Sequence, residues 1–231
     1  MTVDPDAAGR NIRRGRAIIV LGLLGLAALY VMALQFTPLE RFQGPAQKIY
    51  YVHPPGAYGM QLAFTVVGIM SVLYLWLRDP KLDLIAEASA EVGMVFAVLT
   101  LITGPIWGKP VWGAWWTWDA RLTFTLIEFL VFAGYFAMRS AMHDGLDRAR
   151  YSAVLGTMAL LLVPFNHLTV YLYNTTHPEP VVMQTGKPAL PDEMLHTFLV
   201  GMGVFTLLYV GFVMTRYGIG LRRAALETSD A

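Results

Sequence analysis

Six apolar stretches, each long enough to cross a lipid bilayer, constrain this chain more than any other feature. They run roughly over residues 17–36, 57–77, 87–107, 122–138, 152–173 and 194–215. About 20 helical residues span a hydrocarbon core of about 30 Å. Charged residues make up only 14% of the chain, less than the surface of a soluble domain of this size requires. The sequence therefore predicts an all-α polytopic membrane protein, a six-helix bundle that forms one transmembrane domain over residues 1–231.

Lysine and arginine are distributed unevenly between the connecting segments. With the N-terminus inside, the outer segments hold only five of the 17 basic residues: Arg41, Lys48, Lys109, Arg121 and Lys187. The positive-inside rule then places both termini in the cytoplasm. Three loops, at about 37–56, 107–121 and 174–193, face outward. The first stretch is interpreted as a retained helix, and residues 1–9 and 224–231 as disordered tails.

The chain has no cysteine. This excludes disulfides, zinc–thiolate sites, iron–sulfur clusters and thioether attachment of heme to the chain itself. The sequence also contains no Gly-rich phosphate loop ending in Lys-Ser or Lys-Thr, so an ATP-driven step would belong to a partner. We expect neither a nucleic-acid partner nor catalytic residues.

Tryptophan is concentrated in the second outer loop, where five of the six tryptophans fall between residues 107 and 118. If this stretch is an interfacial helix, Trp112, Trp115, Trp116 and Asp119 share one face, and Trp118 points elsewhere. Such a face could hold a flat apolar macrocycle with polar edges. The alternative is an aromatic belt at the membrane surface. The outer ends of the other helices have Tyr and Phe but no Trp, which favours a ligand site.

Four of the five histidines map to the outer half of the bundle. His53 precedes the second span and His177 follows the fifth, both on loops beside the tryptophan stretch. Two neutral imidazoles from separate loops could ligate one heme iron from opposite faces. Either histidine could equally be a solvated loop residue. His167 and His196 are reserve candidates that could instead form hydrogen bonds between helices, and His143 falls in an inner loop.

A few other polar residues lie in or beside the predicted membrane spans, where a charged side chain is costly without a partner. Arg121 and Lys109 flank the tryptophan stretch and could pair with carboxylates of a ligand or simply reach the interface. Glu128 lies inside the fourth span, where an ionised carboxylate is costly, so we expect it to pair with another helix or to stay protonated. Glu87 and Glu91 at the start of the third span should sit at an interface or face other helices.

The run from Trp107 to Thr123, with Trp115-Trp116-Thr117-Trp118-Asp119 at its centre, resembles the "WWD" signature of heme-handling membrane proteins. Within that group the chain is most similar to the CcmC family, heme exporter protein C of System I cytochrome c maturation. Its length and six spans resemble CcmC, and not the larger CcmF or the longer CcsA-type proteins. One departure is Tyr171-Leu172-Tyr173, where family members often have two tryptophans.

The resemblance implies a specific site and specific partners. His53 and His177 match the two axial ligands of heme iron. The tryptophan loop would lie against the heme, with the residues Trp112, Trp115, Trp116, Trp118, Asp119 and Arg121 binding it. The cargo would be heme b, held non-covalently and transiently, at the periplasmic or outer face of a bacterial inner membrane. Delivery would be to the heme chaperone CcmE, together with the CcmA–CcmB transporter, the small subunit CcmD and membrane lipid.

Three other functions remain open from the residues. The chain could be a b-type cytochrome subunit for electron transfer, although such proteins usually bury their histidines within helices. It could be a component of a WWD-family heme lyase. It could also be a membrane scaffold whose tryptophan loop docks a partner without binding heme.

Overall fold

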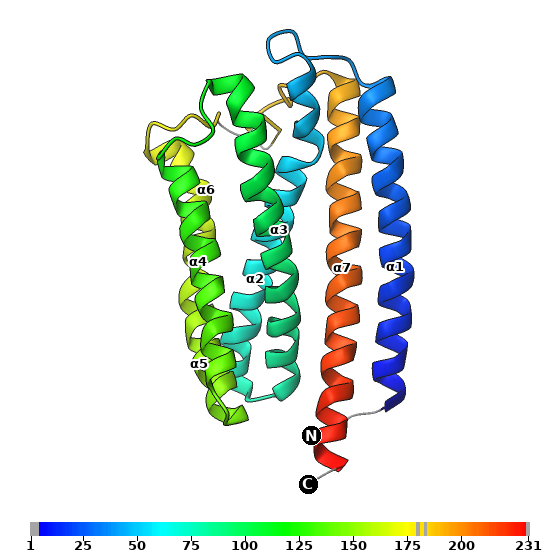
Figure 1. Cartoon of the computed structure of the whole chain (residues 1–231), viewed down its shortest axis with the longest axis vertical. Helices are drawn as coiled ribbons and strands as arrows, with labels where there is room; N and C mark the ends of the chain where they lie inside the picture. The colour runs from blue at the N-terminus through cyan, green and yellow to red at the C-terminus, as the bar shows by residue number, and fades with distance from the viewer. Residues whose placement is uncertain (1–4, 179–180, 183, 230–231) are drawn as a thin grey trace.

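The computed structural model describes residues 5–178, 181–182 and 184–229 of the chain, and its regular structure is helical (Figure 1). Six segments are long and apolar enough to cross a membrane, which confirms the six-span prediction. The elements are α1 (Pro5–Val31) with the π-helical turn η1 (Met32–Phe36), the 3-10 helix η2 (Pro45–Tyr51), α2 (His53–Leu77), α3 (Pro80–Trp112), α4 (Ala120–Ala141), α5 (Gly145–Ala159), α6 (Leu162–Leu172) and α7 (Asp192–Ser229).

The helices at the two ends of the chain are longer than predicted. Residues 5–9 belong to α1 and residues 224–229 to α7, so the prediction that these residues are disordered is wrong. The reason is that α1 packs along α7 down to its first turns. Ala8 is buried, and a methyl group added at Gly218 would lie 3.0 Å from the Ala8 carbonyl oxygen. The outermost residues of both predicted tails, 1–4 and 230–231, lie outside the described residues.

The fifth span is two helices in sequence rather than one. α5 and α6 meet at Leu160 and Leu161, where the Leu161 amide bonds to the Met158 carbonyl in a tighter turn. Pro164 explains the position of this break. Its ring lacks an N–H and crowds the carbonyl four residues earlier, which is that of Leu160.

α1 and α7 pack closely side by side along their lengths (Figure 1). A methyl group added at Gly15 would lie 2.8 Å from the Gly211 carbonyl oxygen, and one at Gly211 would lie 3.0 Å from the Gly15 carbonyl oxygen. Helices in lipid gain van der Waals contact when small residues let their backbones approach in this way. On the other side of α7, α2 and α3 pack together at the centre of the bundle, and α4 lies beside α6.

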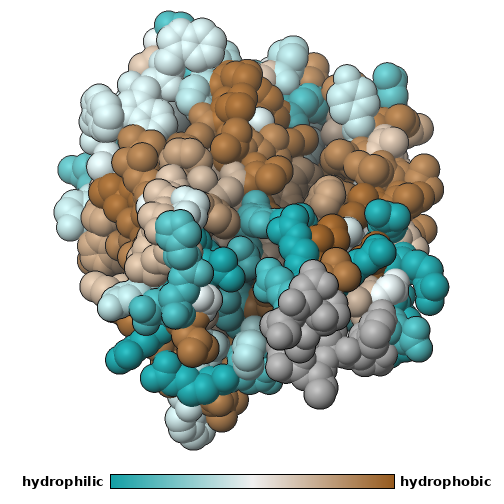
Figure 2. Space-filling model, turned by 60° about the horizontal axis from the view of Figure 1, so that its bottom comes forward, coloured by the Kyte–Doolittle hydropathy of each residue, from teal (hydrophilic) through white to brown (hydrophobic). Residues whose placement is uncertain are grey.

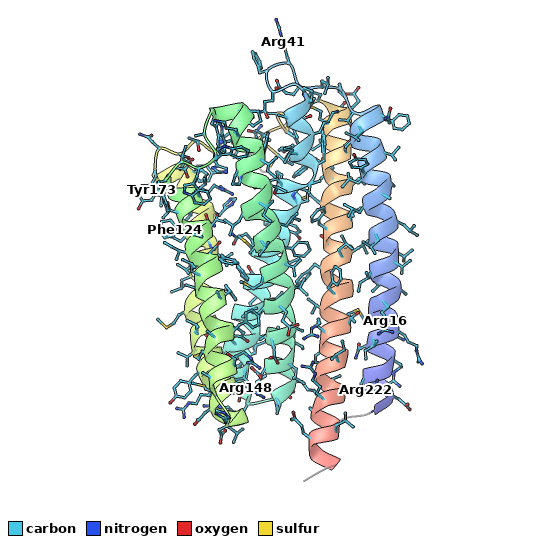
Figure 3. The ribbon with its side chains drawn as sticks, viewed as in Figure 1. Arg16, Arg41, Phe124, Arg148, Tyr173 and Arg222 are labelled. Carbon is cyan, nitrogen blue, oxygen red and sulfur yellow. The ribbon has the colours of Figure 1, made fainter. Side chains whose placement is uncertain are left out.

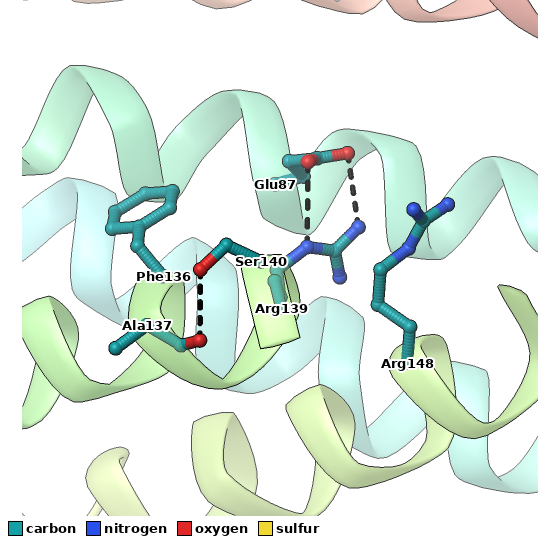
Figure 4. A pocket seen from close by; sticks show the side chains of 6 residues that line it. All are labelled: Glu87, Phe136, Ala137, Arg139, Ser140 and Arg148. Carbon is teal, nitrogen blue, oxygen red and sulfur yellow. Dashed lines mark hydrogen bonds and ion pairs between the residues drawn. The ribbon is translucent and has the colours of Figure 1, made fainter. Parts of the chain in front are cut away.

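Two arginines hold the inner parts of the helices together. Arg139 of α4 is buried and binds Asp83 at 2.7 Å and Glu87 at 2.9 Å, both on α3. Figure 4 shows the contact with Glu87. Arg216 of α7 forms an ion pair with Glu91, also on α3. Glu87 and Glu91 therefore face other helices, one of the two placements expected from sequence.

A second polar cluster lies deeper, around Glu128. This side chain is only 1% exposed, and its Oε2 accepts hydrogen bonds of 2.8 Å from Gln61 of α2 and from Asn166 of α6. The expectation that Glu128 pairs with another helix is confirmed, since two helices supply donors. These bonds tie α2, α4 and α6 together where no water is available to replace them.

The described chain begins and ends at the same end of the bundle (Figure 1). Arg16, Arg148 and Arg222 lie toward this end, and Arg41 lies at the opposite tip (Figure 3). The molecular surface agrees, because hydrophilic residues gather at the end with the termini and hydrophobic ones cover much of the sides (Figure 2). That this end is cytoplasmic remains a prediction from the positive-inside rule.

Removing Arg139 should strongly destabilise the protein. Arg139→Ala leaves Asp83 and Glu87 without their shared cation, and breaking a buried ion pair in this way costs about 3–5 kcal/mol. Arg150→Ala, on the exposed surface of α5, is the control and should change stability little. Unfolding of both variants in detergent measures the difference. Equal stability of the two variants would contradict a structural role for the Arg139 cluster.

Candidate functional site

His53 begins α2 and is buried, so the prediction that it lies on a loop is wrong. Pro54 and Pro55 explain this, because proline suits the first turn of a helix, where its missing N–H has no partner to lose. The Nδ1 atom of His53 lies 2.9 Å from the hydroxyl oxygen of Thr103 on α3. The His53 ring also meets the Trp107 ring edge-on, with centroids 5.7 Å apart.

One face of α3 forms the wall behind His53. Thr103, Gly104 and Trp107 follow one another on this face, at spacings of one and three residues. A methyl group added at Gly104 would lie 3.2 Å from Cε1 of His53, so only glycine gives the imidazole its present clearance. Trp107 is held in turn by a 2.9 Å hydrogen bond from its indole Nε1 to Gln43.

The tryptophan stretch is not an interfacial helix, which corrects the sequence-based prediction. α3 continues to Trp112, Gly113 ends it in the left-handed region with φ of 77°, and residues 113–119 belong to no helix. The Lys109 ammonium donates to the Gly113 carbonyl at 2.9 Å, so it closes the helix end. Trp112 folds back onto Gly108, where an added methyl group would lie 3.0 Å from the indole.

His177 lies in the loop after α6, as predicted, and contacts the end of α3. Its ring centroid is 5.0 Å from that of Trp112. Its Nδ1 is buried and lies 3.8 Å from Oδ2 of Asp119, longer than a hydrogen bond. His53 and His177 thus each contact a tryptophan of the last turns of α3, Trp107 and Trp112 respectively.

Asp119 holds this loop in place. Its Oδ1 caps α4 by accepting from the Leu122 amide, and its Oδ2 accepts from both the amide and the hydroxyl of Thr176. Burial alone would raise the pKa of Asp119, but the contacts with His177, Thr176 and Leu122 outweigh it and hold the pKa well below its usual range. Asp119 is therefore an anion at neutral pH, facing His177.

The remaining predicted site residues divide into two groups. Arg121 is half-buried and interacts electrostatically with Asp119 and His53, yet its guanidinium makes no hydrogen bond or ion pair within the described parts of the chain. Trp116 is half-buried and meets Trp118 edge-on at 5.7 Å. Trp115 and Trp118 are 60% and 76% exposed. They therefore do not form one continuous aromatic face with Trp112, although the sequence predicted this for Trp115.

Both site histidines present the same nitrogen. Nε2 of each ring makes no hydrogen bond to any residue that the structure describes. Nδ1 of His53 is hydrogen-bonded to Thr103, whereas Nδ1 of His177 lies 3.8 Å from Asp119 and is not bonded to it. An unpartnered Nε2 with an oriented Nδ1 is the arrangement of a metal-ligating histidine. The donor set of two neutral imidazoles beside indole rings fits heme iron.

The three other histidines lie apart from this arrangement. His143, His167 and His196 are exposed, and none of them makes a hydrogen bond among the residues covered by the structure. The alternative that His167 and His196 form hydrogen bonds between helices is therefore wrong. The His167 ring meets the Tyr171 ring, with centroids 6.4 Å apart.

Sequence reasoning missed the wall of α3. Trp107 was placed in the tryptophan stretch but given no role, and Thr103 and Gln43 drew no attention. The available signal was the helical spacing of Thr103, Gly104 and Trp107, which share one face if the helix continues past Pro105. The predicted span over residues 87–107 contains all three residues, but the sequence does not show that this face meets His53.

Comparison with known proteins places the chain in a family. The family model described as CcmC, heme exporter protein C, matches residues 9–230. The chain belongs to the CcmC family. A heme exporter protein C of Haemophilus influenzae is 34% identical over 89% of this chain and 82% of its own length. That of Bradyrhizobium diazoefficiens is 38% identical over 84% and 72%. A putative cytochrome c biosynthesis ccmC-like mitochondrial protein of Marchantia polymorpha is 30% identical over 81% and 79%.

In this CcmC chain, Asp119→Ala should release the loop that carries His177. The variant loses both the α4 cap, worth about 1 kcal/mol, and the two bonds to Thr176. Hydrogen–deuterium exchange should become faster in residues 174–178. Asp144→Ala is the matched control, because Asp144 caps α5 through the Leu146 and Asp147 amides. Unchanged exchange in 174–178 of the Asp119 variant would show that the loop is held by other contacts.

Proposed function

We propose that this protein is a heme-handling subunit of cytochrome c maturation that holds heme b non-covalently at the outer rim of the membrane. The observation that carries the proposal is the pair formed by His53 and His177. They are 124 residues apart in sequence, each contacts a tryptophan of α3, and both leave Nε2 without a partner among the described residues. Each would supply one axial ligand to the iron.

The surroundings of the pair suit a porphyrin. Trp107 and Trp112 each place an indole edge-on to one of the two imidazoles, which gives the macrocycle apolar walls near both ligands. Arg121 offers a guanidinium that the described chain does not pair, and heme propionates are carboxylates that such a group binds bidentately. Asp119 is already engaged with the Thr176 loop, so its role is to position His177.

Family membership supports the wider role. Relatives bear the name heme exporter protein C, and the Marchantia relative is named for cytochrome c biosynthesis. We infer that heme is passed to the chaperone CcmE, with CcmA–CcmB and CcmD as partners, in a bacterial inner membrane with the site facing outward. The exposed rings of Trp115 and Trp118 leave one edge of the site open to an incoming protein.

Replacing either ligand should remove heme. His53→Ala and His177→Ala should each lower the Soret absorbance of protein purified from heme-replete cells at least severalfold, because one neutral ligand is lost from the iron. His143→Ala, an exposed histidine at the opposite end, should retain the wild-type spectrum. Wild-type Soret bands in both site variants would refute the axial pair. A heme-free wild type would favour a scaffold.

Delivery is tested separately from binding. Cells that contain the His177→Ala variant should accumulate much less heme-loaded CcmE than cells with wild type or His143→Ala at equal expression. A b-type cytochrome for electron transfer would not require this. Normal chaperone loading by a variant that has lost its Soret band would contradict a role in delivery.

A further inference from the structure

Thr103 stands between His53 and the backbone of its own helix. Its hydroxyl oxygen lies 2.7 Å from the Leu99 carbonyl oxygen and 2.9 Å from Nδ1 of His53. Both distances are those of hydrogen bonds. The hydroxyl therefore has two partners, one on each side.

The chemistry of these partners determines where the protons are. A carbonyl oxygen can only accept, so the single Thr103 hydroxyl proton is donated to Leu99. The hydroxyl oxygen then has only lone pairs to offer to His53. The bond to His53 requires the proton to be on Nδ1, and in a neutral imidazole this leaves Nε2 unprotonated.

We propose that Thr103 is a positioning residue that sets the tautomer of His53 and thereby turns the lone pair of Nε2 toward the iron. This inference rests on the proposed function, in which His53 is an axial ligand. Thr103 is held in its rotamer by its bond to Leu99, and Gly104 leaves room for the imidazole, since an added methyl group there would lie 3.2 Å from Cε1 of His53. The ring is therefore oriented before heme arrives, and none of the binding energy is spent on choosing between tautomers.

His177, the other proposed ligand, has no hydroxyl group of the described chain hydrogen-bonded to its Nδ1. This nitrogen lies 3.8 Å from Asp119. The inference therefore concerns His53 alone. It also gives Thr103 an electronic effect, because a hydrogen bond from Nδ1–H makes the imidazole a stronger donor to the iron.

The test uses three variants of the full-length protein. Thr103→Val keeps the shape of the side chain and removes the hydroxyl, while Thr103→Ser keeps the hydroxyl. Thr100→Val is the matched control, because Thr100 is another α3 residue whose hydroxyl donates to a carbonyl four residues earlier, that of Phe96, at 2.8 Å. Thr100 is buried and Thr103 is half-buried, so the control is at least as sensitive to packing. Heme affinity, the midpoint potential of bound heme and the thermal stability of the heme-free protein are measured for each.

Thr103→Val should weaken heme binding by about 10–100-fold, the usual effect of losing a second-shell partner of a metal ligand. The midpoint potential of the remaining heme should rise, because a weaker donor stabilises ferric iron less. Thr103→Ser should restore both values, and Thr100→Val should match wild type in both.

Two results would overturn the inference while leaving the proposed function intact. One is a Thr103→Val variant with wild-type affinity and potential. The other is an equal loss in Thr103→Val and Thr100→Val, which would indicate a packing effect. If His53→Ala itself keeps the wild-type Soret band, His53 is not an axial ligand, and Thr103 has no ligand to position. If His177→Ala keeps it as well, the axial pair of the proposed function is refuted.

Discussion

The continuation of α3 past Pro105 and Pro110 determines the arrangement of the end of the bundle opposite the termini of the described chain. Each proline removes one backbone donor and disturbs the turn before it, yet the helix ends only at Gly113. The extra turns carry Trp107 to His53 and Trp112 to His177. Two histidines from distant parts of the chain thus contact the same helix, and the distance between them depends on the length of α3.

The two ends of the molecule differ in whether their buried or half-buried polar side chains have partners. Toward the end where the described chain begins and finishes, Arg139 and Arg216 are matched by carboxylates of α3. At the other end, Arg121 and the Nε2 atoms of both histidines have no protein partner within the described residues. In a medium without water such groups are costly when unpaired. This end of the bundle is therefore the one where polar side chains are left without protein partners among the described residues.

The sequence was sufficient to predict the number of spans, the concentration of aromatic rings at one end and the involvement of His177 with the tryptophan stretch. These follow from apolar run length and from residue clustering, which are local properties. The break near Leu160 and the helical start at His53 were missed, because proline can either begin, kink or end a helix and its neighbours in space decide which. The roles of Thr103 and Gly104 depend on the rotation of α3 about its axis, which no local pattern specifies.

The two oxygens of Asp119 serve different segments. Oδ1 caps α4 through Leu122, and Oδ2 holds Thr176. Because these bonds do not share an atom, loss of the bonds to Thr176 would leave the cap of α4 in place. One carboxylate thus fixes two segments, the start of α4 and the loop that carries His177, through independent contacts.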